Sequence, residues 1–379
     1  MRLLQIALSL LVLANAAYLL LVLGCVLRFA RRRGPQAAQV ALPVAILKAV
    51  KGVEPGSERA LESFFALDYP RYQLIFALAD GNDPALPLIR RLMERHPERG
   101  AKIVIASQRL GPNEKMSNLA QALGEATGEL VALADADVLV RPGWLREMAA
   151  PFSDPKVGLT TCLYRAGEAP GLWSRLEGLN IASDLMPQVM VAESLEGISF
   201  ALGASVCVRR QALEGIGGFA ALAQYLADDY LLGNRLQRAG WRLILLPQTV
   251  ELLFPRQGAR DYLSHQLRWA RTYRACRPAG WAATAITHTV LWGPLYLAAQ
   301  GFSGLGWLVL AGLAALRGAG YLAADLLVLG GGRTLTNLLL LPVKDALSLG
   351  VFVASFAGRT VRWRGKAFRL DPEGRLIPQ

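Results

Sequence analysis

Two pairs of aspartates are the residues in this sequence most able to do chemistry. In the first pair, Asp135 and Asp137 follow the apolar run 130–134. Alternate residues near the end of a strand point to one side of a sheet. Two carboxylates so placed can hold a divalent cation such as Mn²⁺ or Mg²⁺, with phosphate oxygens as further ligands. The alternative is a turn pair ahead of a helix that begins near Pro142.

The second pair, Asp228 and Asp229, precedes a helical pattern that begins at Tyr230. A carboxylate at such a place can accept the proton of a substrate hydroxyl, as a general base does. The alternative is N-capping of the helix, which is a common role of aspartate. The sequence leaves both interpretations open.

A third candidate element combines basic and aromatic side chains on one predicted helix, residues 260–274. His265, Arg268 and Trp269 share one face of it at spacings i, i+3 and i+4. Two further arginines on this helix extend a basic stripe. The element is either a phosphate clamp with an aromatic wall or an amphipathic helix at a membrane surface.

The segments around these candidates read as an α/β domain. Apolar runs at 40–47, 73–79, 102–106 and 130–134 predict strands, and helices are predicted at 57–66, 84–96 and 117–126. Such alternation predicts βαβ units and a mostly parallel sheet, which binds ligands at the carboxyl ends of its strands. Asp80 and Asp135 stand at predicted strand ends. The absence of GxGxxG and GxxxxGK[ST] motifs argues against dinucleotide and P-loop chemistry.

Composition indicates membrane segments outside this domain. The chain is 53% hydrophobic and 18% charged, against about 25% charged in soluble proteins. The run from Leu3 to Leu27 has no charged residue and can span a hydrocarbon core of about 30 Å as a helix. The alternative is a cleaved signal peptide, because Ala14-Asn15-Ala16 resembles a cleavage site.

The arginines that follow this run predict its orientation. Arg28, Arg31, Arg32 and Arg33 follow it, whereas only Arg2 precedes it, so the positive-inside rule places the following domain in the cytoplasm. The net charge of +12 suits the anionic inner leaflet. No nucleic-acid-binding motif is present, so nucleic acid is not expected as a partner. The four cysteines fit a reducing compartment.

The C-terminal third contains more apolar sequence. Residues 278–316 have no charge and are too many for one span, and the glycine-rich segment 301–306 could divide them into two helices. A last apolar stretch, 335–358, contains Lys344-Asp345 and either spans the membrane or lies at its interface. The expected organisation is an N-terminal span (1–33), a cytoplasmic domain (34–277), membrane helices (278–358) and a basic tail (359–379).

These elements, in this order, resemble membrane glycosyltransferases with a nucleotide-sugar-binding domain. More closely, the chain resembles the ceramide glucosyltransferases, and within that family a bacterial hopanoid-associated subgroup. The matching motifs run along nearly the whole chain: Ile46-Leu47-Lys48, Leu67-Asp68-Tyr69-Pro70, Asp80, Asn113 with Lys115, Ala134-Asp135-Ala136-Asp137, Gly203-Ala204-Ser205, Ala227-Asp228-Asp229-Tyr230, Arg268-Trp269 and Trp363-Arg364-Gly365.

The resemblance implies a GT-A-like α/β fold with helices on both faces of its sheet, flanked by transmembrane helices. It implies inverting transfer of a sugar, glucose or N-acetylglucosamine, from a UDP-sugar to the hydroxyl of a membrane lipid such as ceramide or bacteriohopanetetrol. The implied setting is the bacterial inner membrane, with a multi-pass chain and its catalytic domain in the cytoplasm.

The resemblance also implies a role for each candidate residue. Asp229 falls at the catalytic base, with Asp228 in support, and Asp135 and Asp137 fall at the site of Mn²⁺ or Mg²⁺ and the diphosphate. The residues implied to bind the nucleotide sugar are Lys48, Asp80, Lys115, Asp135, Asp137, His265, Arg268 and Trp269. The chain departs from the family at His265, where Gln or Arg is usual and the hopanoid-associated subgroup has His.

The apolar stretch 172–191 could form a lipid-facing groove or an ordinary core helix. Two other functions compete with the implied one. A processive polysaccharide synthase would need more spans to form a polymer channel than this C-terminal region offers. An inactive membrane scaffold would not require the intact carboxylates at Asp80, Asp135, Asp137 and Asp229.

Overall fold

The computed structural model describes residues 2–35, 41–332 and 334–379, which form two compact units. The sheet unit comprises residues 33–169 and 196–255, and the helical unit comprises residues up to Arg32, 170–195 and 256–379. The predicted boundaries at residues 33 and 277 divide the chain by membrane position. That division stays a prediction, because the two units are defined by internal packing alone.

The sheet unit is built on one mixed sheet with strand order β3-β2-β1-β4-β7-β6-β8-β5. β1 pairs in parallel with β2 and β4, and β2 with β3, whereas β7 is antiparallel to both β4 and β6. The strand bounds are β1 (Val44–Ala49), β2 (Tyr72–Leu78), β3 (Lys102–Ile105), β4 (Leu130–Ala134), β5 (Val138–Leu139), β6 (Val157–Ala166), β7 (Ser205–Arg209) and β8 (Arg242–Leu252).

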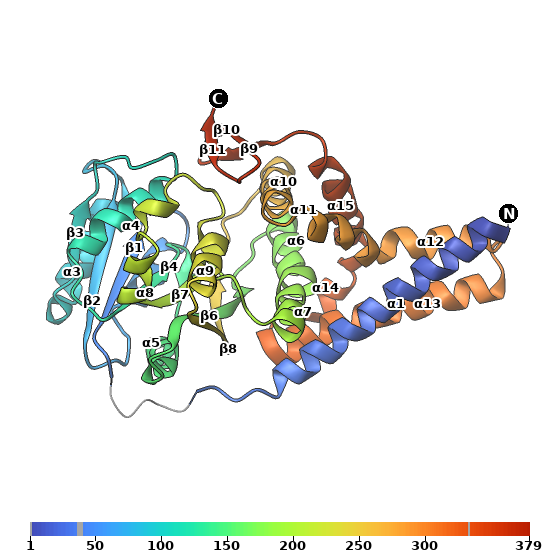
Figure 1. The fold of residues 1–379 in the computed structure, drawn as a ribbon, viewed down its shortest axis with the longest axis horizontal. Coiled ribbons are helices and arrows are strands. Elements are labelled where there is room, and N and C mark those ends of the chain that lie inside the picture. The colour runs from blue at the N-terminus through green and yellow to red at the C-terminus, as the bar shows by residue number, and fades with distance from the viewer. Residues whose placement is uncertain (1, 36–40, 333) are drawn as a thin grey trace. The chain divides into compact units, whose positions relative to one another are not determined.

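Helices cover both faces of this sheet (Figure 1). Met116 of α4 and Leu232 of α9 pack on one face with the core of β1, β2 and β4. On the other face, Phe64 meets Trp144 with ring centroids 5.5 Å apart, beside Phe65 and Phe76. The helices of this unit are α2 (Ser57–Glu62), α3 (Ala85–Arg95), α4 (Glu114–Gly124), α5 (Trp144–Ala149), α8 (Arg210–Gly215) and α9 (Asp228–Arg238).

The predicted βαβ alternation is confirmed over the first half of the unit. β1 and β4 are apolar and buried along nearly their whole length, as strands inside a parallel sheet are. The strand predicted from residue 40 begins at Val44, and Val40 lies outside the described residues. The strands β5 to β8 were not predicted from the sequence. β7 pairs antiparallel with β4 and β6, β5 pairs antiparallel with β8, and β6 pairs in parallel with β8.

Among the described residues of the helical unit, two helices are long and apolar enough to cross a membrane. The first is α1 (Arg2–Ala30). The second is α13 (Gly304–Ala324), which continues as the π-helix η6 (Asp325–Leu329). Side chains of α1, α12 (Thr289–Ala299) and α13 form one apolar cluster, and the three helices run side by side in Figure 1. The predicted break in the apolar run 278–316 is confirmed, because α12 ends at Ala299 and α13 begins at Gly304.

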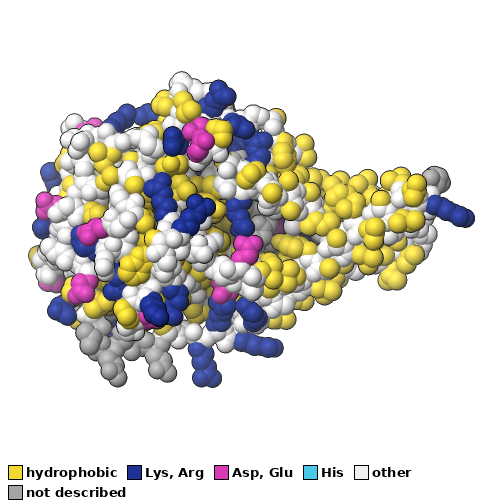
Figure 2. All heavy atoms as spheres, in the orientation of Figure 1, with side chains coloured by type: hydrophobic (Ala, Val, Ile, Leu, Met, Phe, Trp, Pro, Cys, Tyr) yellow, Lys and Arg dark blue, Asp and Glu magenta, His cyan; other side chains and the backbone are white. Residues whose placement is uncertain are grey.

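The outer surface of these helices is apolar. Figure 2 shows hydrophobic side chains over much of their visible face. The exposed ones include Leu3, Leu10, Leu13 and Leu20 of α1 and Leu308 of α13. A contiguous apolar surface of this kind is expected where lipid, rather than water, surrounds the helices.

Shorter helices complete the unit. They are α6 (Leu172–Asn180), the π-helical η3 (Ile181–Leu185), α7 (Met186–Glu196), α10 (Ala259–Cys276), α11 (Pro278–Ala283), the 3₁₀ turn η5 (Thr284–Thr287), α14 (Thr334–Leu338) and α15 (Leu341–Ser355). Within the stretch 172–191, Leu176, Ile181, Met186 and Met190 are buried, as the interpretation as core helix predicts.

Lys344, which is buried, and Asp345 belong to a cluster of four charges. Lys344 Nζ lies 2.5 Å from Asp184 and 2.7 Å from Asp345, and Arg317 Nη2 lies 2.5 Å and 2.7 Å from the same two carboxylates. A buried charge is tolerated only when it is paired and hydrogen-bonded. The cluster therefore ties α13, α15 and η3 together, and it explains why charged residues interrupt an apolar stretch.

The segment expected as a basic tail is folded. It forms a three-stranded antiparallel sheet of β9 (Thr360–Trp363), β10 (Lys366–Leu370) and β11 (Leu376–Pro378). Arg364 and Gly365 link β9 and β10 with φ values of 49° and 76°, the left-handed geometry that two-residue hairpins favour. The Trp363-Arg364-Gly365 motif is thus a hairpin turn.

Candidate functional site

The candidate residues of the sheet unit gather at one edge of the sheet. Lys48 is near the end of β1, Asp80 follows β2, and Asp135 follows β4. Because these three strands are parallel neighbours, their carboxyl ends meet at the edge where ligands of open α/β sheets bind.

Lys48 holds the backbone of the first aspartate pair. Its fully buried Nζ donates to the backbone oxygen of Asp135 at 2.5 Å and lies 3.8 Å from the centre of the Phe64 ring. Burial lowers the pKa of Lys48 to about 7, although Asp135 and Asp137 oppose that shift. Lys48 therefore positions the turn that carries both carboxylates.

Lys115 links the two aspartate pairs. It stands in the first turn of α4, which Asn113 caps by accepting from the Met116 amide at 3.1 Å. Its Nζ lies 2.5 Å from Asp135 Oδ1 and 4.0 Å from Asp228 Oδ2. Burial alone would lower the pKa of Lys115, but the neighbouring carboxylates outweigh burial and raise it. The ammonium group is therefore a permanent positive charge between the pairs.

Asp229 is held by the backbone on both of its oxygens. Oδ2 accepts from the Gly203 amide at 3.0 Å, and Oδ1 accepts from the Tyr230 amide at 2.7 Å. A Cβ at residue 203 would lie 2.9 Å from Asp229 Oδ2, so the close approach requires glycine there. Gly233 similarly lets α9 lie against the backbone of Phe200, where a Cβ would come within 2.5 Å.

The interpretation of this pair as an N-cap is wrong. α9 begins at Asp228, its N-cap residue is Ala227, and no side chain caps it. Both aspartates thus lie inside the first turn, where the helix dipole favours negative charge. Their carboxylates remain available for a chemical role.

This edge carries more negative than positive charge. Four carboxylates, Asp135, Asp137, Asp228 and Asp229, face two amines, Lys48 and Lys115, and one amine has a lowered pKa. Burial, together with repulsion from Asp229 and Asp135, raises the pKa of Asp228 to about 7 despite Lys115.

Burial also raises the pKa of Asp229, against the effect of Lys115. Burial and repulsion from Asp135 raise the pKa of Asp137 to about 6. The edge is therefore prepared to receive positive charge.

The residues fit a divalent cation that arrives with a phosphate group. Asp135 and Asp137 offer hard oxygen ligands, as Mn²⁺ and Mg²⁺ prefer. Within the described part of the chain, no three His, Cys, Asp or Glu side chains are arranged so that they could hold one metal ion by themselves. The remaining ligands would have to come from a substrate and water, which is typical of metals bound with nucleotide phosphates.

Asp80 lies apart from this cluster. Its Oδ1 accepts from the Asn82 amide at 2.9 Å in a local turn after β2. The neighbouring Asp83, which with Pro84 closes the loop of Asp80, accepts from the amides of Gly52 at 2.9 Å and Ala85 at 2.8 Å. Asp83 thereby joins the loops after β1 and β2 and starts α3.

The third candidate element belongs to the helical unit. His265 Nδ1 bonds the carboxylate of Glu177, which is almost fully buried and also accepts from Gln257. The rings of His265 and Trp269 lie 4.6 Å apart at 60°. Arg268 is on the same helix, α10. Glu177 was not predicted as a site residue, although an acidic residue within the apolar stretch 172–191 could have indicated it.

The two further arginines on α10 have structural roles instead of extending a clamp or a membrane face. Arg271 donates to the backbone oxygens of Ala357 and Thr360, and Arg274 donates to that of Gly358 at 2.6 Å. They satisfy carbonyl groups between α15 and β9.

Comparison with known proteins places the chain among glycosyltransferases. A family model described as glycosyl transferase family 21 matches residues 7–376. The chain is 22% identical over 350 residues to ceramide glucosyltransferase 3 of Caenorhabditis elegans, which covers 88% of this chain and 74% of that protein. It is 27% identical over 207 residues to beta-monoglucosyldiacylglycerol synthase of Synechocystis sp., covering 54% of this chain and 42% of that protein.

A solved structure has the same fold. A mannosyltransferase from Pyrobaculum calidifontis, in complex with GDP-Man and Mn²⁺, superposes with a TM-score of 0.55 at 19% identity, covering 93% of this chain and 97% of that one. The predicted GT-A-like fold class is confirmed by this likeness together with the sheet described above.

The charge excess leads to a prediction about pH. The pKa of Asp228 is about 7 in the folded protein and about 3.9 in an unfolded chain. At a pH between these two values, the folded protein binds a proton at Asp228 that the unfolded chain does not bind. Wild-type stability should therefore fall as pH rises from about 4 to 7. Asp228→Asn lacks this group, so its melting temperature relative to wild type should rise between pH 5 and pH 8.

The matched control is Asp68→Asn, because the Asp68 side chain is 70% exposed. Its melting temperature relative to wild type should not depend on pH in this way. An Asp228→Asn difference that stays constant or falls with pH would contradict the charge argument.

Proposed function

Because this chain belongs to glycosyl transferase family 21, we propose that it transfers a sugar from a UDP-sugar to the hydroxyl of a membrane lipid, with inversion at the anomeric carbon. The observation that carries the proposal is the pair of partly buried aspartates at the start of α9, linked through Lys115 to Asp135. The names of the relatives, a ceramide glucosyltransferase and a glucosyldiacylglycerol synthase, support a lipid acceptor.

Asp229 is the proposed base. The acceptor hydroxyl gives its proton to the Asp229 carboxylate while its oxygen forms a bond to the anomeric carbon. The bond from that carbon to the diphosphate breaks, and UDP leaves with the electron pair. A base works best when its pKa lies near the working pH, and the raised pKa of Asp229 supports this role. The Gly203 and Tyr230 amides fix its direction.

The other residues bind and neutralise the donor. Asp135 and Asp137 would hold Mn²⁺ or Mg²⁺, which when bound supplies positive charge against the diphosphate. Lys115 keeps Asp135 and Asp228 in place, and Lys48 fixes the turn between β4 and β5. The remaining proposed contacts to the nucleotide sugar are Asp80, His265, Arg268 and Trp269.

The proposed setting is the cytoplasmic side of a bacterial inner membrane. α1 and α13–η6 are long and apolar enough to span, and the exposed leucines of α1 support contact with lipid. The arginines after α1 favour a cytoplasmic position for the sheet unit.

The role of Asp229 predicts a selective loss of turnover. Asp229→Asn keeps shape and most hydrogen bonding but cannot take the acceptor proton, so kcat should fall about 10²–10⁴-fold. The affinity for UDP-sugar should change little, because the proposed base acts on the acceptor. Transfer of radiolabelled sugar to lipid and UDP-sugar binding are measured in detergent. Asp228→Asn is the adjacent control, expected to keep more activity, and normal turnover in both variants would refute the assignment.

Metal dependence is predicted from the first aspartate pair. EDTA should abolish transfer, and added Mn²⁺ or Mg²⁺ should restore it. Asp137→Asn should reduce turnover strongly and require more metal for half-maximal rate, whereas Asp80→Asn should keep the wild-type metal requirement. Full activity in EDTA would remove the metal from the mechanism.

Topology is predicted from the arginines after α1. A reporter fused near Pro35 should be protected from a membrane-impermeant label added to intact cells, and one at the N-terminus should be labelled. The reverse pattern would place the sheet unit outside.

A further inference from the structure

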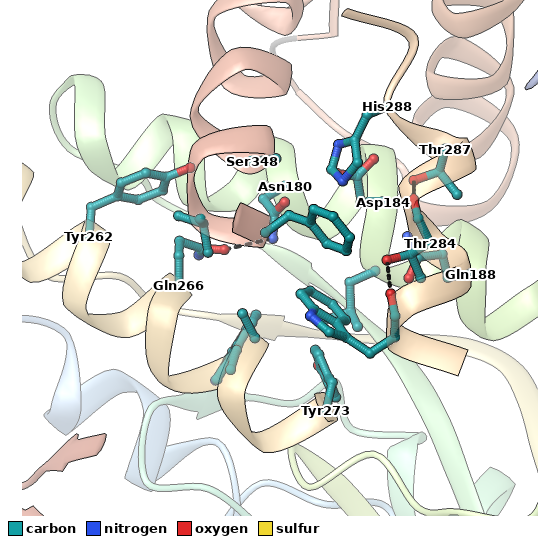
Figure 3. A pocket seen from close by; sticks show the side chains of 16 residues that line it. Asn180, Asp184, Gln188, Tyr262, Gln266, Tyr273, Thr284, Thr287, His288 and Ser348 are labelled. Carbon is teal, nitrogen blue, oxygen red and sulfur yellow. Dashed lines mark hydrogen bonds between the residues drawn. The ribbon is translucent and has the colours of Figure 1, made fainter. Parts of the chain in front are cut away.

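The helical unit contains a cavity of about 90 Å³ whose wall includes Gln266 and Trp269 of α10. Figure 3 shows the side chains that line it. Since one water occupies about 10–15 Å³ on this measure, the space exceeds that of a single water. Its wall is contributed by α6 with η3 and α7, by α10, by the segment from α11 to His288, and by α15. Its aromatic side chains are Tyr262, Trp269, Tyr273, Trp281 and Phe352.

Two buried polar atoms of the lining have no hydrogen-bond partner within the described residues. They are Nε2 of Gln266 and Nε2 of His288. Asn180 Nδ2 donates to Gln266 Oε1 at 3.0 Å, as Figure 3 shows, so that contact uses the oxygen of the amide and leaves its nitrogen as a free donor. Buried polar groups are normally satisfied, and both atoms belong to residues that line the cavity, so a ligand whose oxygen atoms reached them would supply the missing partners.

The charge of the lining limits what that ligand is. The lining residues include one acidic side chain, Asp184, and one histidine, His288, but no lysine or arginine. Asp184 is already paired with Arg317 and Lys344, each at 2.5 Å. A phosphate in the cavity would therefore meet no unpaired cation, and losing its hydration there would be costly. An uncharged group with carbonyl or hydroxyl oxygens fits.

The surroundings favour a lipid over a soluble molecule. Trp281 and Phe352 stack with ring centroids 5.5 Å apart, and Phe352 also contacts His288. His288 thus stands against an aromatic pair, in the same unit as the two helices that are apolar enough to span a membrane. A lipid presents this combination where its chains join an oxygen-bearing head.

We propose that this cavity binds the uncharged, oxygen-bearing segment of the acceptor lipid, with Gln266 donating to a carbonyl or hydroxyl oxygen and His288 bonding a second hydroxyl. This rests on the proposed function and adds to it two residues that select a neutral acceptor against a lipid phosphate. Gln266 lies between His265 and Arg268 on α10, so the same helix serves the acceptor cavity and carries proposed contacts to the donor.

The test measures lipid binding without donor, on the full chain in mixed micelles. The probes are tritiated ceramide and dioleoylglycerol, each paired with its phosphorylated counterpart. Wild type should bind at least one neutral lipid, and bind its phosphate at least tenfold more weakly. Gln266→Met keeps side-chain length and removes the donor, and His288→Phe keeps a ring against Phe352. Each should raise the Kd of the neutral lipid about tenfold, as for one hydrogen bond.

Two further variants separate binding from folding. Ser348→Leu fills the cavity from α15 without removing either polar atom and should also weaken neutral-lipid binding. Gln237→Met makes the matched change at an exposed position of α9 and should leave binding unchanged. All variants are compared by melting temperature, and a variant that binds weakly at wild-type stability supports the site.

The proposal is overturned if neither neutral lipid binds, if the phosphorylated lipids bind as tightly, or if Gln266→Met, His288→Phe and Ser348→Leu all bind like wild type. Failure of the proposed function is distinguishable. A protein that binds neutral lipid through these residues yet transfers no sugar keeps the cavity and refutes the function. A protein that transfers sugar with an unchanged acceptor KM in all three variants keeps the function and refutes the cavity.

Discussion

An excess of negative charge at the carboxyl edge of the sheet is the constraint on which the site depends. Four aspartates converge there with only two lysines, and the pKa values of Asp137 and Asp228 rise to about 6 and about 7. Lys115 compensates part of the repulsion by joining the loop after β4 to the start of α9. The remaining imbalance is a cost to stability. The proposed metal site would account for it, since perturbed carboxylates concentrate at functional sites.

The helical unit contains the contrasting arrangement. Asp184 and Asp345 face Arg317 and Lys344, each carboxylate is paired with both cations, and the cluster is balanced. Such saturation suits a structural role, because it ties helices together and leaves no charge for a ligand. Among the described residues of this unit, the buried side-chain atoms without a hydrogen-bond partner belong to Ser194, Gln266, Arg271 and His288, and of these residues Gln266 and His288 line the cavity. The two proposals therefore differ in the ligand that each unit would receive: a cation with its phosphate in the sheet unit, and an uncharged oxygen-bearing group in the helical unit.

The sequence predicted the parts of this arrangement that depend on local pattern. The buried strands, the position of Asp135 after β4 and the break before Gly304 all follow from apolar runs and the residues that end them. The antiparallel β7 was not predictable in this way, because its place between β4 and β6 is set by pairing with strands distant in sequence. The ion pair of Lys344 with Asp184 was not predictable either, because Asp184 lies far upstream in the sequence, in a stretch that is mostly apolar.

Glu177 connects the departure at His265 to the rest of the site. α6 presents Glu177 and Asn180 one turn apart, and they bond the consecutive residues His265 and Gln266 of α10. A glutamine is usual at this position in the family, and the histidine here instead brings a ring nitrogen to the Glu177 carboxylate and places its ring beside Trp269. The residue at 265 is thus coupled to Glu177, and the contacts of Glu177 and Asn180 join α6 to the part of α10 that lines the cavity.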